Sequence, residues 1–442
     1  KNGEKMRSYF LLLCLWSTSF VSASMEKDAH NSAQKKSNIS FNRTTAILFN
    51  RLPEDMQDAI WDKLREWRHK QTLVGHTGPV MALVYSPDGM QLASGSFDKT
   101  IKFYHSATGA DIQTIAAQSP QNPHDHSHYI MTLAYSPDGT QIASGSYDKS
   151  IRFHNRATGA HIQTIAAQSP QNPHGHSNWV RTLAYSPDGT QLASGSDDKT
   201  IKIWNPITST HMQTIAAQSP QNPHGHSHYV MTLAYSPDGT QLASGSYDKS
   251  IRFHNRETGD HIQTISAQSP QNPHGHSNWV RTLAYSPDGT QLASGSVDKT
   301  IKIWNPITST HMQTIAALSP QNPHGHSDIV RTLAYSPDGT QLASGSYDKT
   351  IKFHDPVTGA HIQTIAAQSP QNPHGHSNWV ITLVYSLNGK QIASGSWDNT
   401  IKLWDSSSSN NEDAYEQAKQ DAVRKKYQPV LAELLRKKME KK

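Results

Sequence analysis

Short runs of apolar and small residues, separated by turn residues, fill the chain after Gly75. The first run, VMALVYS (residues 80–86), alternates larger and smaller side chains, which is typical of a β-strand. It ends in Ser-Pro-Asp-Gly, a tight turn in which proline is preset for the second position. Three further runs follow, MQLASGS, KTIKFYH and ADIQTIA, with turns at Asp98 and at Thr108-Gly109 between them. The pattern predicts four consecutive short strands.

This unit of four predicted strands recurs every fifty residues. Helical spacing fits nowhere between Gly75 and Trp404. The fold class we predict is all-β: a seven-bladed β-propeller of four-stranded antiparallel blades. The seven copies are marked by one turn aspartate each: Asp98, Asp148, Asp198, Asp248, Asp298, Asp348 and Asp398.

The two ends of the repeat array predict how the ring closes. The seventh copy supplies three strands up to Trp404 and then becomes SSSSNN, without a fourth strand. The missing strand lies at the other end, where HKQTL (residues 69–73) copies HIQTI (residues 161–165). We therefore expect the N-terminal strand to pair into the last blade, which removes an exposed sheet edge.

The motif common to the copies, GH followed by SPDG (SLNG in the seventh copy) and then LASGSxDKTIKxW, resembles the WD-repeat family from Gly75 to Trp404. The resemblance implies a structural tetrad: tryptophan donates to a strand serine (Ser94 or Ser96 in the first copy), which meets a histidine, which meets the turn aspartate. Besides the seven aspartates, its members are His76, His126, His176, His226, His276, His326, His376, Trp204, Trp304 and Trp404.

Four copies depart from this pattern, because Tyr104, His154, His254 and His354 occupy the tryptophan position. A histidine retains one N–H donor, so we expect these blades to be weakened rather than lost.

In the WD-repeat family, partners often bind the narrower face of the ring, near the start of the first strand and just before the turn aspartate. These two columns are rich in Tyr and Trp, and arginines lie two residues beyond the first; such residues dominate binding hot spots. The alternative is that the aromatic rings only pack on one another between blades. The predicted partner-binding face comprises Tyr129, Tyr147, Trp179, Arg181, Tyr229, Tyr247, Trp279, Arg281, Arg331, Tyr347, Trp379 and Trp397.

The connectors between blades contain the insert AAQSPQNPH, whereas the N-terminal copy needs only Val74 at this place. We expect them to lie on the same face as the aromatic columns and to raise its rim. Near-identity of residues 125–224 and 225–324 indicates a duplicated pair of blades, which explains part of their fidelity. Each connector carries one histidine: His124, His174, His224, His274, His324 and His374.

These histidines offer a zinc or copper site as one alternative, since His124, His126 and His128 lie at alternate positions. The resemblance, however, assigns His126 to the tetrad, and alternate residues of a strand point to opposite faces. We therefore expect no metal and no other cofactor. Protonation in acid would make the connectors more cationic.

Composition and charge exclude other functions. The formal net charge is +5, but residues 411–442 hold nine Lys or Arg against six Asp or Glu, so +3 belongs to the tail. The nearly neutral body does not favour nucleic-acid binding. The sequence has neither a glycine-rich phosphate loop nor a cysteine beyond Cys14, and its aspartates recur as turn residues. We expect no catalytic activity.

The flanking segments suggest targeting and docking. Residues 1–23 resemble a secretory signal peptide, with a basic start, an apolar run and Val21-Ser22-Ala23. Residues 24–44 are a polar linker. Residues 45–67 predict an amphipathic helix with Met56, Ile60, Leu64 and Trp67 on its apolar face; its opening LPE resembles an F-box. Residues 68–405 form the propeller, and residues 406–442 predict a basic helical tail.

Together these features predict an exported, monomeric scaffold that binds a protein partner on one face of the propeller, without a transmembrane segment in the mature chain. The alternative is a substrate-recognition adaptor of a ubiquitin ligase, docked through the F-box-like helix. That alternative implies a place inside a cell, which delivery of an exported protein into a host cell would reconcile with the leader.

Overall fold

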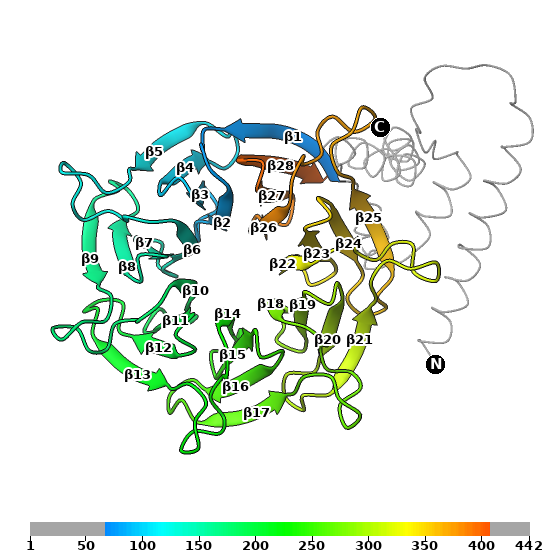
Figure 1. Cartoon of the computed structure of the whole chain (residues 1–442). Coiled ribbons are helices and arrows are strands. Elements are labelled where there is room, and N and C mark those ends of the chain that lie inside the picture. Colours follow the sequence, from blue (N-terminus) through cyan, green and yellow to red (C-terminus); the bar gives the residue numbers. More distant parts are fainter. Residues whose placement is uncertain (1–66, 407–442) are drawn as a thin grey trace, which may run out of the picture. The chain divides into compact units, whose positions relative to one another are not determined.

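A computed structural model of the chain describes residues 67–406. Seven four-stranded antiparallel sheets stand around a central opening (Figure 1). The strands run from the inside of the ring outward in chain order in six blades, and the seventh blade has the order β1-β28-β27-β26. The predicted fold class, a seven-bladed all-β propeller with four strands per blade, is confirmed.

The strands are short and recur with the sequence period. Blades 1 to 3 consist of β2 Val80–Tyr85, β3 Gln91–Ser96, β4 Ile101–His105, β5 Asp111–Ile115; β6 Ile130–Tyr135, β7 Gln141–Ser146, β8 Ile151–Asn155, β9 His161–Ile165; β10 Val180–Tyr185, β11 Leu192–Ser196, β12 Ile201–Trp204 and β13 His211–Ile215.

Blades 4 to 7 repeat this arrangement. They consist of β14 Val230–Tyr235, β15 Gln241–Ser246, β16 Ile251–Asn255, β17 His261–Ile265; β18 Val280–Tyr285, β19 Leu292–Ser296, β20 Ile301–Trp304, β21 His311–Ile315; β22 Val330–Tyr335, β23 Leu342–Ser346, β24 Ile351–His354, β25 His361–Ile365; β26 Val380–Tyr385, β27 Gln391–Ser396, β28 Thr400–Ser406 and β1 Trp67–Val74.

Ser-Pro-Asp-Gly turns in blades 1 to 6, and Ser-Leu-Asn-Gly in blade 7, join the first two strands of each blade through local hydrogen bonds. In blade 1, Ser86 Oγ donates to Asp88 Oδ1 at 2.6 Å, and the Gly89 amide donates to the Ser86 carbonyl at 2.7 Å. Gly89 has a φ of 72°, a left-handed conformation that glycine adopts without strain. The turn therefore fixes the β2–β3 hairpin locally.

Neighbouring blades pack closely because the second strand carries a glycine where the next blade approaches. A Cβ added to Gly95 would lie 2.6 Å from Ile130 Cγ2, and one added to Gly145 would lie 2.7 Å from Val180 Cγ1. Between each pair of sheets lies a small core, such as the one around Phe103, Ile130 and Ile142. The 35% hydrophobic content is thus distributed over seven inter-blade cores instead of one deep core.

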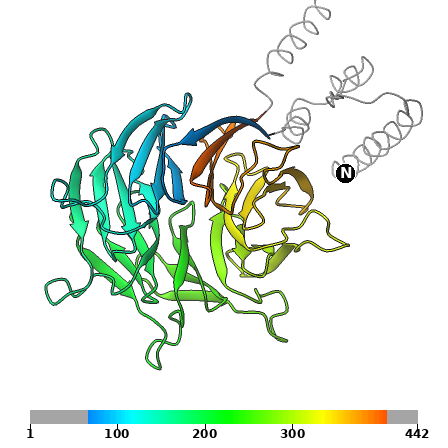
Figure 2. The same cartoon turned by 45° about the horizontal axis from the view of Figure 1, so that its top comes forward.

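Strand β1 closes the ring as predicted. It pairs antiparallel with β28, from Trp67 opposite Ser406 to Val74 opposite Thr400. The first and last described strands lie side by side in Figures 1 and 2.

The prediction that Trp67 belongs to the amphipathic helix, as its last apolar residue, is wrong. Trp67 is the first residue of β1 and is buried. Its indole stacks on Phe353 of blade 6 with a centroid distance of 5.4 Å, and its amide donates to Gln363 Oε1 at 2.8 Å. The blade 6 surface offers this side chain a buried position, so the closing strand begins one residue earlier than the expected boundary at residue 68.

The connectors have a structure of their own and extend outward beyond the outer strands (Figure 1). In the connector of residues 166–176, the Gln168 amide donates to the His176 carbonyl at 3.0 Å, and Ser169 and Asn172 form an isolated bridge. The Asn172 side-chain amide donates to the Ala166 carbonyl. The string AAQSPQNPH, which recurs in the connectors of this chain, thus encodes a folded loop rather than an extended spacer.

The predicted signal peptide, the linker, the tail and the rest of the F-box-like helix lie outside the described residues. Within residues 67–406, no helix has the length and apolar character needed to cross a membrane.

Candidate partner-binding face

A histidine–aspartate–serine network holds the inner strands of every blade. In blade 1, His76 Nδ1 lies 2.7 Å from Asp98 Oδ2 and His76 Nε2 lies 2.7 Å from Ser94 Oγ. The other six blades repeat both contacts with distances of 2.7 to 2.9 Å. Of the two candidate serines, the one that meets the histidine is Ser94, whereas Ser96 donates to the Gly78 carbonyl.

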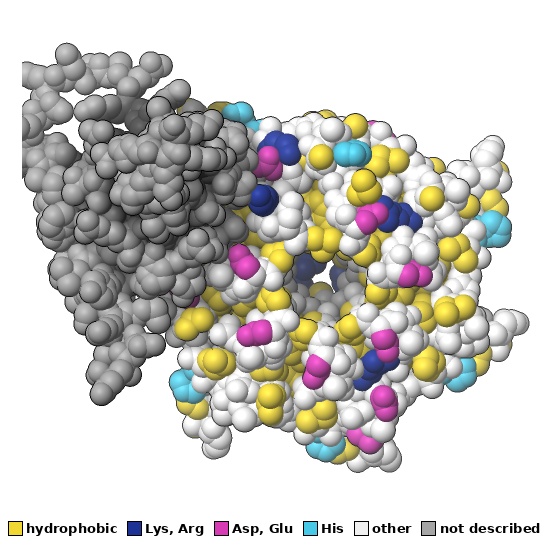
Figure 3. Space-filling view, turned by 180° about the vertical axis from the view of Figure 1, so that it is seen from behind, with side chains coloured by type: hydrophobic (Ala, Val, Ile, Leu, Met, Phe, Trp, Pro, Cys, Tyr) yellow, Lys and Arg dark blue, Asp and Glu magenta, His cyan; other side chains and the backbone are white. Residues whose placement is uncertain are grey.

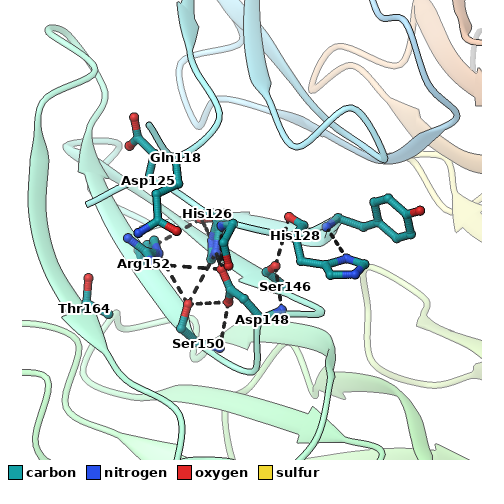
Figure 4. Close-up of polar contacts among 12 residues, drawn as sticks. Gln118, Asp125, His126, His128, Ser146, Asp148, Ser150, Arg152 and Thr164 are labelled. Carbon is teal, nitrogen blue, oxygen red and sulfur yellow. Dashed lines mark hydrogen bonds and ion pairs between the residues drawn. The ribbon is translucent and has the colours of Figure 1, made fainter. Parts of the chain in front are cut away.

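Blade 2 shows the surroundings of the aspartate (Figure 4). Asp148 accepts hydrogen bonds from the Ser127 amide at 3.1 Å and from Ser150 Oγ at 2.5 Å, besides its contact with His126. Arg152 lies 3.9 Å away at the edge of this network. The carboxylate is surrounded by donors that belong to its own blade, so it has a structural role.

These contacts keep the turn aspartates ionised. Burial by itself would raise the pKa of Asp198, but hydrogen bonds from His176 and Thr200 lower it to about 2. The histidine has the opposite tendency, since burial lowers the pKa of His176 although Asp198 raises it. The pair therefore fixes a charged carboxylate below the surface, where a partner has no access to it.

The tryptophan completes the network in three blades. Nε1 of Trp204, Trp304 and Trp404 donates to the serine of its own blade at 2.7 to 2.8 Å.

The three blades with a histidine at the tryptophan position are not lost, since each has four strands, but the histidine does not take the place of the tryptophan donor. Nδ1 of His154, His254 and His354 is buried without a hydrogen-bond partner, and His154 Nε2 contacts Asp125 at 3.3 Å instead of the serine. The imidazole is shorter than the indole, so its nitrogens do not meet the serine hydroxyl. Tyr104 differs from the histidines, because its buried hydroxyl interacts with Ser94, the serine of its own blade.

The aromatic residues of the two predicted columns form stacked pairs that bridge neighbouring blades. Centroid distances are 4.0 Å for Phe97–Tyr129, 3.9 Å for Tyr147–Trp179, 3.9 Å for Tyr247–Trp279 and 4.2 Å for Tyr347–Trp379. Trp397 lies 5.4 Å from Trp379 and 5.1 Å from Phe97, and Tyr229 lies 5.5 Å from Tyr247. We call these residues, with Arg181, Arg281 and Arg331, the aromatic–arginine belt.

Stacking does not bury the belt completely. Trp179 and Trp279 are 37% and 39% exposed, and the other aromatic members are partly buried. The packing that we named as the alternative to binding is therefore present, yet it leaves ring surface in contact with solvent. Stacking also restricts the rotamers of these side chains before any partner arrives.

The three arginines of the belt have different partners. Arg181 forms a bidentate ion pair with Asp197, with Nε–Oδ1 and Nη2–Oδ2 distances of 2.7 Å, and donates to the Tyr147 hydroxyl at 2.6 Å. Arg281 donates to the hydroxyl of Tyr247 and, at 3.4 Å, to that of Tyr347. Arg281 Nε and Arg331 Nε are buried without a partner.

The connector histidines lie at the periphery and stack on the outer strand of the following blade. His174 lies 4.2 Å from His211 in β13, and His374 lies 4.3 Å from His69 in β1. Equivalent stacks join His124, His224, His274 and His324 to His161, His261, His311 and His361. The connector histidines thus pack against the outer strands of the blades, and the expectation that the connectors raise the rim of the binding face stays a prediction.

Among residues 67–406, no three His, Cys, Asp or Glu side chains are grouped so that they could hold a metal ion. His124 and His126 diverge as expected, because the first stacks on β9 and the second contacts Asp148.

Sequence comparison identifies the class of protein to which this fold belongs. Seven segments match the family described as WD domain, G-beta repeat: residues 67–105, 118–155, 168–205, 218–255, 268–305, 319–355 and 368–405. The chain belongs to this WD40 family, as its motifs indicated. WD40 propellers are typically protein-interaction scaffolds and are usually non-catalytic.

Individual relatives match only over about one repeat. The chain is similar to Protein Mut11 of Chlamydomonas reinhardtii, with 48% identity over 48 residues, which are 11% of this chain and 13% of that protein. It is also similar to WD repeat, SAM and U-box domain-containing protein 1 of Danio rerio, with 40% identity over 58 residues, 13% of this chain and 10% of the relative. These matches span only a small part of each relative.

Proposed function

We propose that this protein is a non-catalytic scaffold that binds a protein partner on the aromatic–arginine belt. The observation that carries the proposal is the partial exposure of Trp179 and Trp279 while both rings are held by stacked tyrosines. Large aromatic surfaces that are already ordered lose little conformational entropy when a partner covers them.

The charge distribution supports the same face. Arg181 and Arg281 lie over tyrosine rings with guanidinium-to-centroid distances of 4.8 Å to Tyr147 and 5.3 Å to Tyr247. Arginine and aromatic side chains together are enriched at protein interfaces. The opposite edge of the blades, where the Ser-Pro-Asp-Gly turns lie, pairs its arginines with its own aspartates, such as Arg156 with Asp88 at 2.7 Å.

The test is affinity capture with the full chain and with the triple variant W179A/W279A/W379A. We expect the variant to remain folded, because only Trp379 of the three packs against a buried cluster, and to lose the captured partners. Retention of the same partners by the triple variant would contradict the proposal. The control is the variant I207A/I307A/V357A, which removes side chains that are 74% to 78% exposed in the outer turns after strands β12, β20 and β24.

A second function, adaptor of a ubiquitin ligase, rests on the LPE motif at residues 52–54. Co-purification of a ligase subunit by the full chain, lost on L52A/P53A, would support it. Export is proposed from residues 6–24, and N-terminal sequencing of the protein from its source would test it by cleavage after Ala23.

A further inference from the structure

The second residues of the seven innermost strands form a column around the mouth of the central channel. The chemical character of this column differs between the two halves of the mouth. On blades 7, 1 and 2, Ile381, Met81 and Met131 pack together as one apolar cluster. The remaining members of the column are Arg181, Met231, Arg281 and Arg331. One half of the mouth is therefore apolar, and the other holds three arginines.

The carboxylate charge within the belt does not balance these arginines. Asp197, which precedes the turn aspartate of blade 3, forms the bidentate pair with Arg181. Arg281 has two neutral tyrosine hydroxyls as its hydrogen-bond acceptors. Arg331 makes no hydrogen bond or ion pair within residues 67–406, and its Nε is buried. Arg281 and Arg331 are thus two half-buried cations without an anion.

The arginines converge on the channel axis. Burial, followed by Arg281, lowers the pKa of Arg331 to about 10, and Arg181 of blade 3 contributes in the same direction. Burial raises the pKa of Tyr147 of blade 2, and Arg331 of blade 6, across the ring, acts in the opposite direction on this pKa. Figure 3, which views the ring from behind, shows Lys or Arg side chains inside the central opening. Like charges brought together under partial burial create a site that favours an anion.

We propose that this cationic half of the channel mouth binds an acidic side chain of the protein partner, with Arg281 and Arg331 holding its carboxylate. A guanidinium presents two parallel N–H donors to a carboxylate, so the Nη atoms of Arg331, which have no hydrogen-bond partner within residues 67–406, match such a ligand beside Arg281. The stacked Tyr347–Trp379 pair adjoins the site and offers apolar surface to the residues that flank the acid. The inference rests on the proposed function, because it assigns the partner's chemistry at the same face.

The chain itself supplies the substitution that tests this site. Met81, Met131 and Met231 occupy the equivalent position in other blades, so R331M and R281M introduce a residue that the fold already accommodates there. The probe is a short labelled peptide that alternates Glu and Ser, titrated with the full-length chain and followed by fluorescence anisotropy. The matched peptide alternates Gln and Ser.

We expect the Glu peptide to bind about tenfold more tightly than the Gln peptide, and R281M and R331M each to weaken it by about tenfold or more. R181M should have a smaller effect, since Asp197 already neutralises Arg181. The control R156M removes an arginine at the opposite edge of the blades and should not change binding. Equal affinities for the two peptides, or wild-type affinity of R331M, would overturn the proposal.

Measuring the melting temperatures of the same variants distinguishes a loss of binding from a loss of folding. Because Arg331 is a half-buried cation next to Arg281, R331M should melt at a higher temperature than the wild type while it binds the Glu peptide less well. A lower melting temperature would show that Arg331 has a structural role and would contradict the assignment.

Capture experiments separate this proposal from the broader one. If W179A/W279A/W379A loses the partners but R331M keeps all of them, the belt is the binding face and the acidic anchor is wrong. If both variants keep the partners, both proposals fail.

Discussion

Histidines of residues 67–406 have different roles, and their position in the blade decides which one applies. Seven histidines join the turn aspartate to the strand serine below the surface. Three others fill the tryptophan position with Nδ1 buried and without a partner. The connector histidines stack on histidines of the outer strands. Depending on its position, a histidine side chain forms hydrogen bonds in the network, fills buried volume or stacks on another ring.

The tryptophan position offers a matched pair of substitutions. W304F removes the donor to Ser294 and part of a buried ring, so we expect the free energy of unfolding to fall by about 1–3 kcal/mol. H254F removes a buried nitrogen without a partner and should cost less than about 1 kcal/mol or stabilise the blade. Urea unfolding followed by circular dichroism measures both. Equal decreases in the free energy of unfolding for W304F and H254F would show that His254 stabilises its blade as much as Trp304 does.

Acid should destabilise the protein in two separate windows. Burial, followed by His324, lowers the pKa of His361 to about 4 from 6.5, and burial with His374 lowers that of His69 to about 4. The unfolded chain then binds protons at a higher pH than the folded chain, so stability decreases as the pH falls from 6.5 toward 4. The melting temperature measured across this interval should fall, and H361Q should reduce the slope.

A second loss should follow at lower pH. The pKa of Asp198 is lowered to about 2 from 3.8, so the stability that its carboxylate contributes is complete above 3.8 and disappears as the pH falls through 2. A melting temperature that is constant between pH 6.5 and 4 would contradict the role given to the stacked histidines.

At the scale of elements, the connectors show how an insert can be an ordered part of a repeat. Each one folds on itself through its asparagine and serine and then docks a histidine on the next outer strand. Gly275 lies where this loop is tightest, since an added Cβ would be 2.4 Å from the Ser266 carbonyl oxygen. The first connector has Asp125 at the corresponding place.

This difference predicts the effect of a single methyl group. G275A should force the loop open and lower the free energy of unfolding by about 1–3 kcal/mol. D125N is the control, because a Cβ is already accommodated there and the substitution keeps an oxygen for the contact with His154. Thermal unfolding measures stability, and hydrogen exchange of the Gln268 amide reports on the loop. Protection of this amide in G275A equal to that in the wild type would contradict the role assigned to the glycine.

At the scale of the whole molecule, stability depends on the contact between the first and last described strands. Trp67 anchors β1 to blade 6 through Phe353 and Gln363, and the strand pairs with β28 in blade 7. One short segment thus connects two blades as well as both ends of the propeller.

Removal of this anchor should open the ring. W67A deletes a buried indole and should lower the free energy of unfolding by about 3–5 kcal/mol. Hydrogen exchange should increase first in β28, because its outer partner is released. The control is V74A at the other end of the same strand, where the side chain is 79% exposed. Equal effects of the two substitutions would show that Trp67 does not anchor the strand.

The sequence was sufficient to predict the blades. It was insufficient to predict which side chains contact one another within and between blades. Alternation, turn residues and the fifty-residue period are local signals, so strands, blade number and closure followed from them. The unpartnered Nδ1 atoms of His154, His254 and His354 could not be predicted, because a donor's presence does not tell whether it reaches its acceptor. The pairing of Arg181 with Asp197 was missed, although the two residues lie sixteen positions apart in one repeat.

The sequence by itself determined the architecture, because in a repeat protein each unit contacts only its neighbours and the turn aspartate that marks the unit recurs seven times. What only the tertiary structure decided is the state of the belt: which rings stack, which arginine has a carboxylate, and which two do not. The physical reason is that these side chains belong to different blades and meet at the axis of the ring. Their separation along the chain, 34 residues for Arg281 and Tyr247 and 66 for Arg281 and Tyr347, carries no periodic signal that a single repeat could reveal.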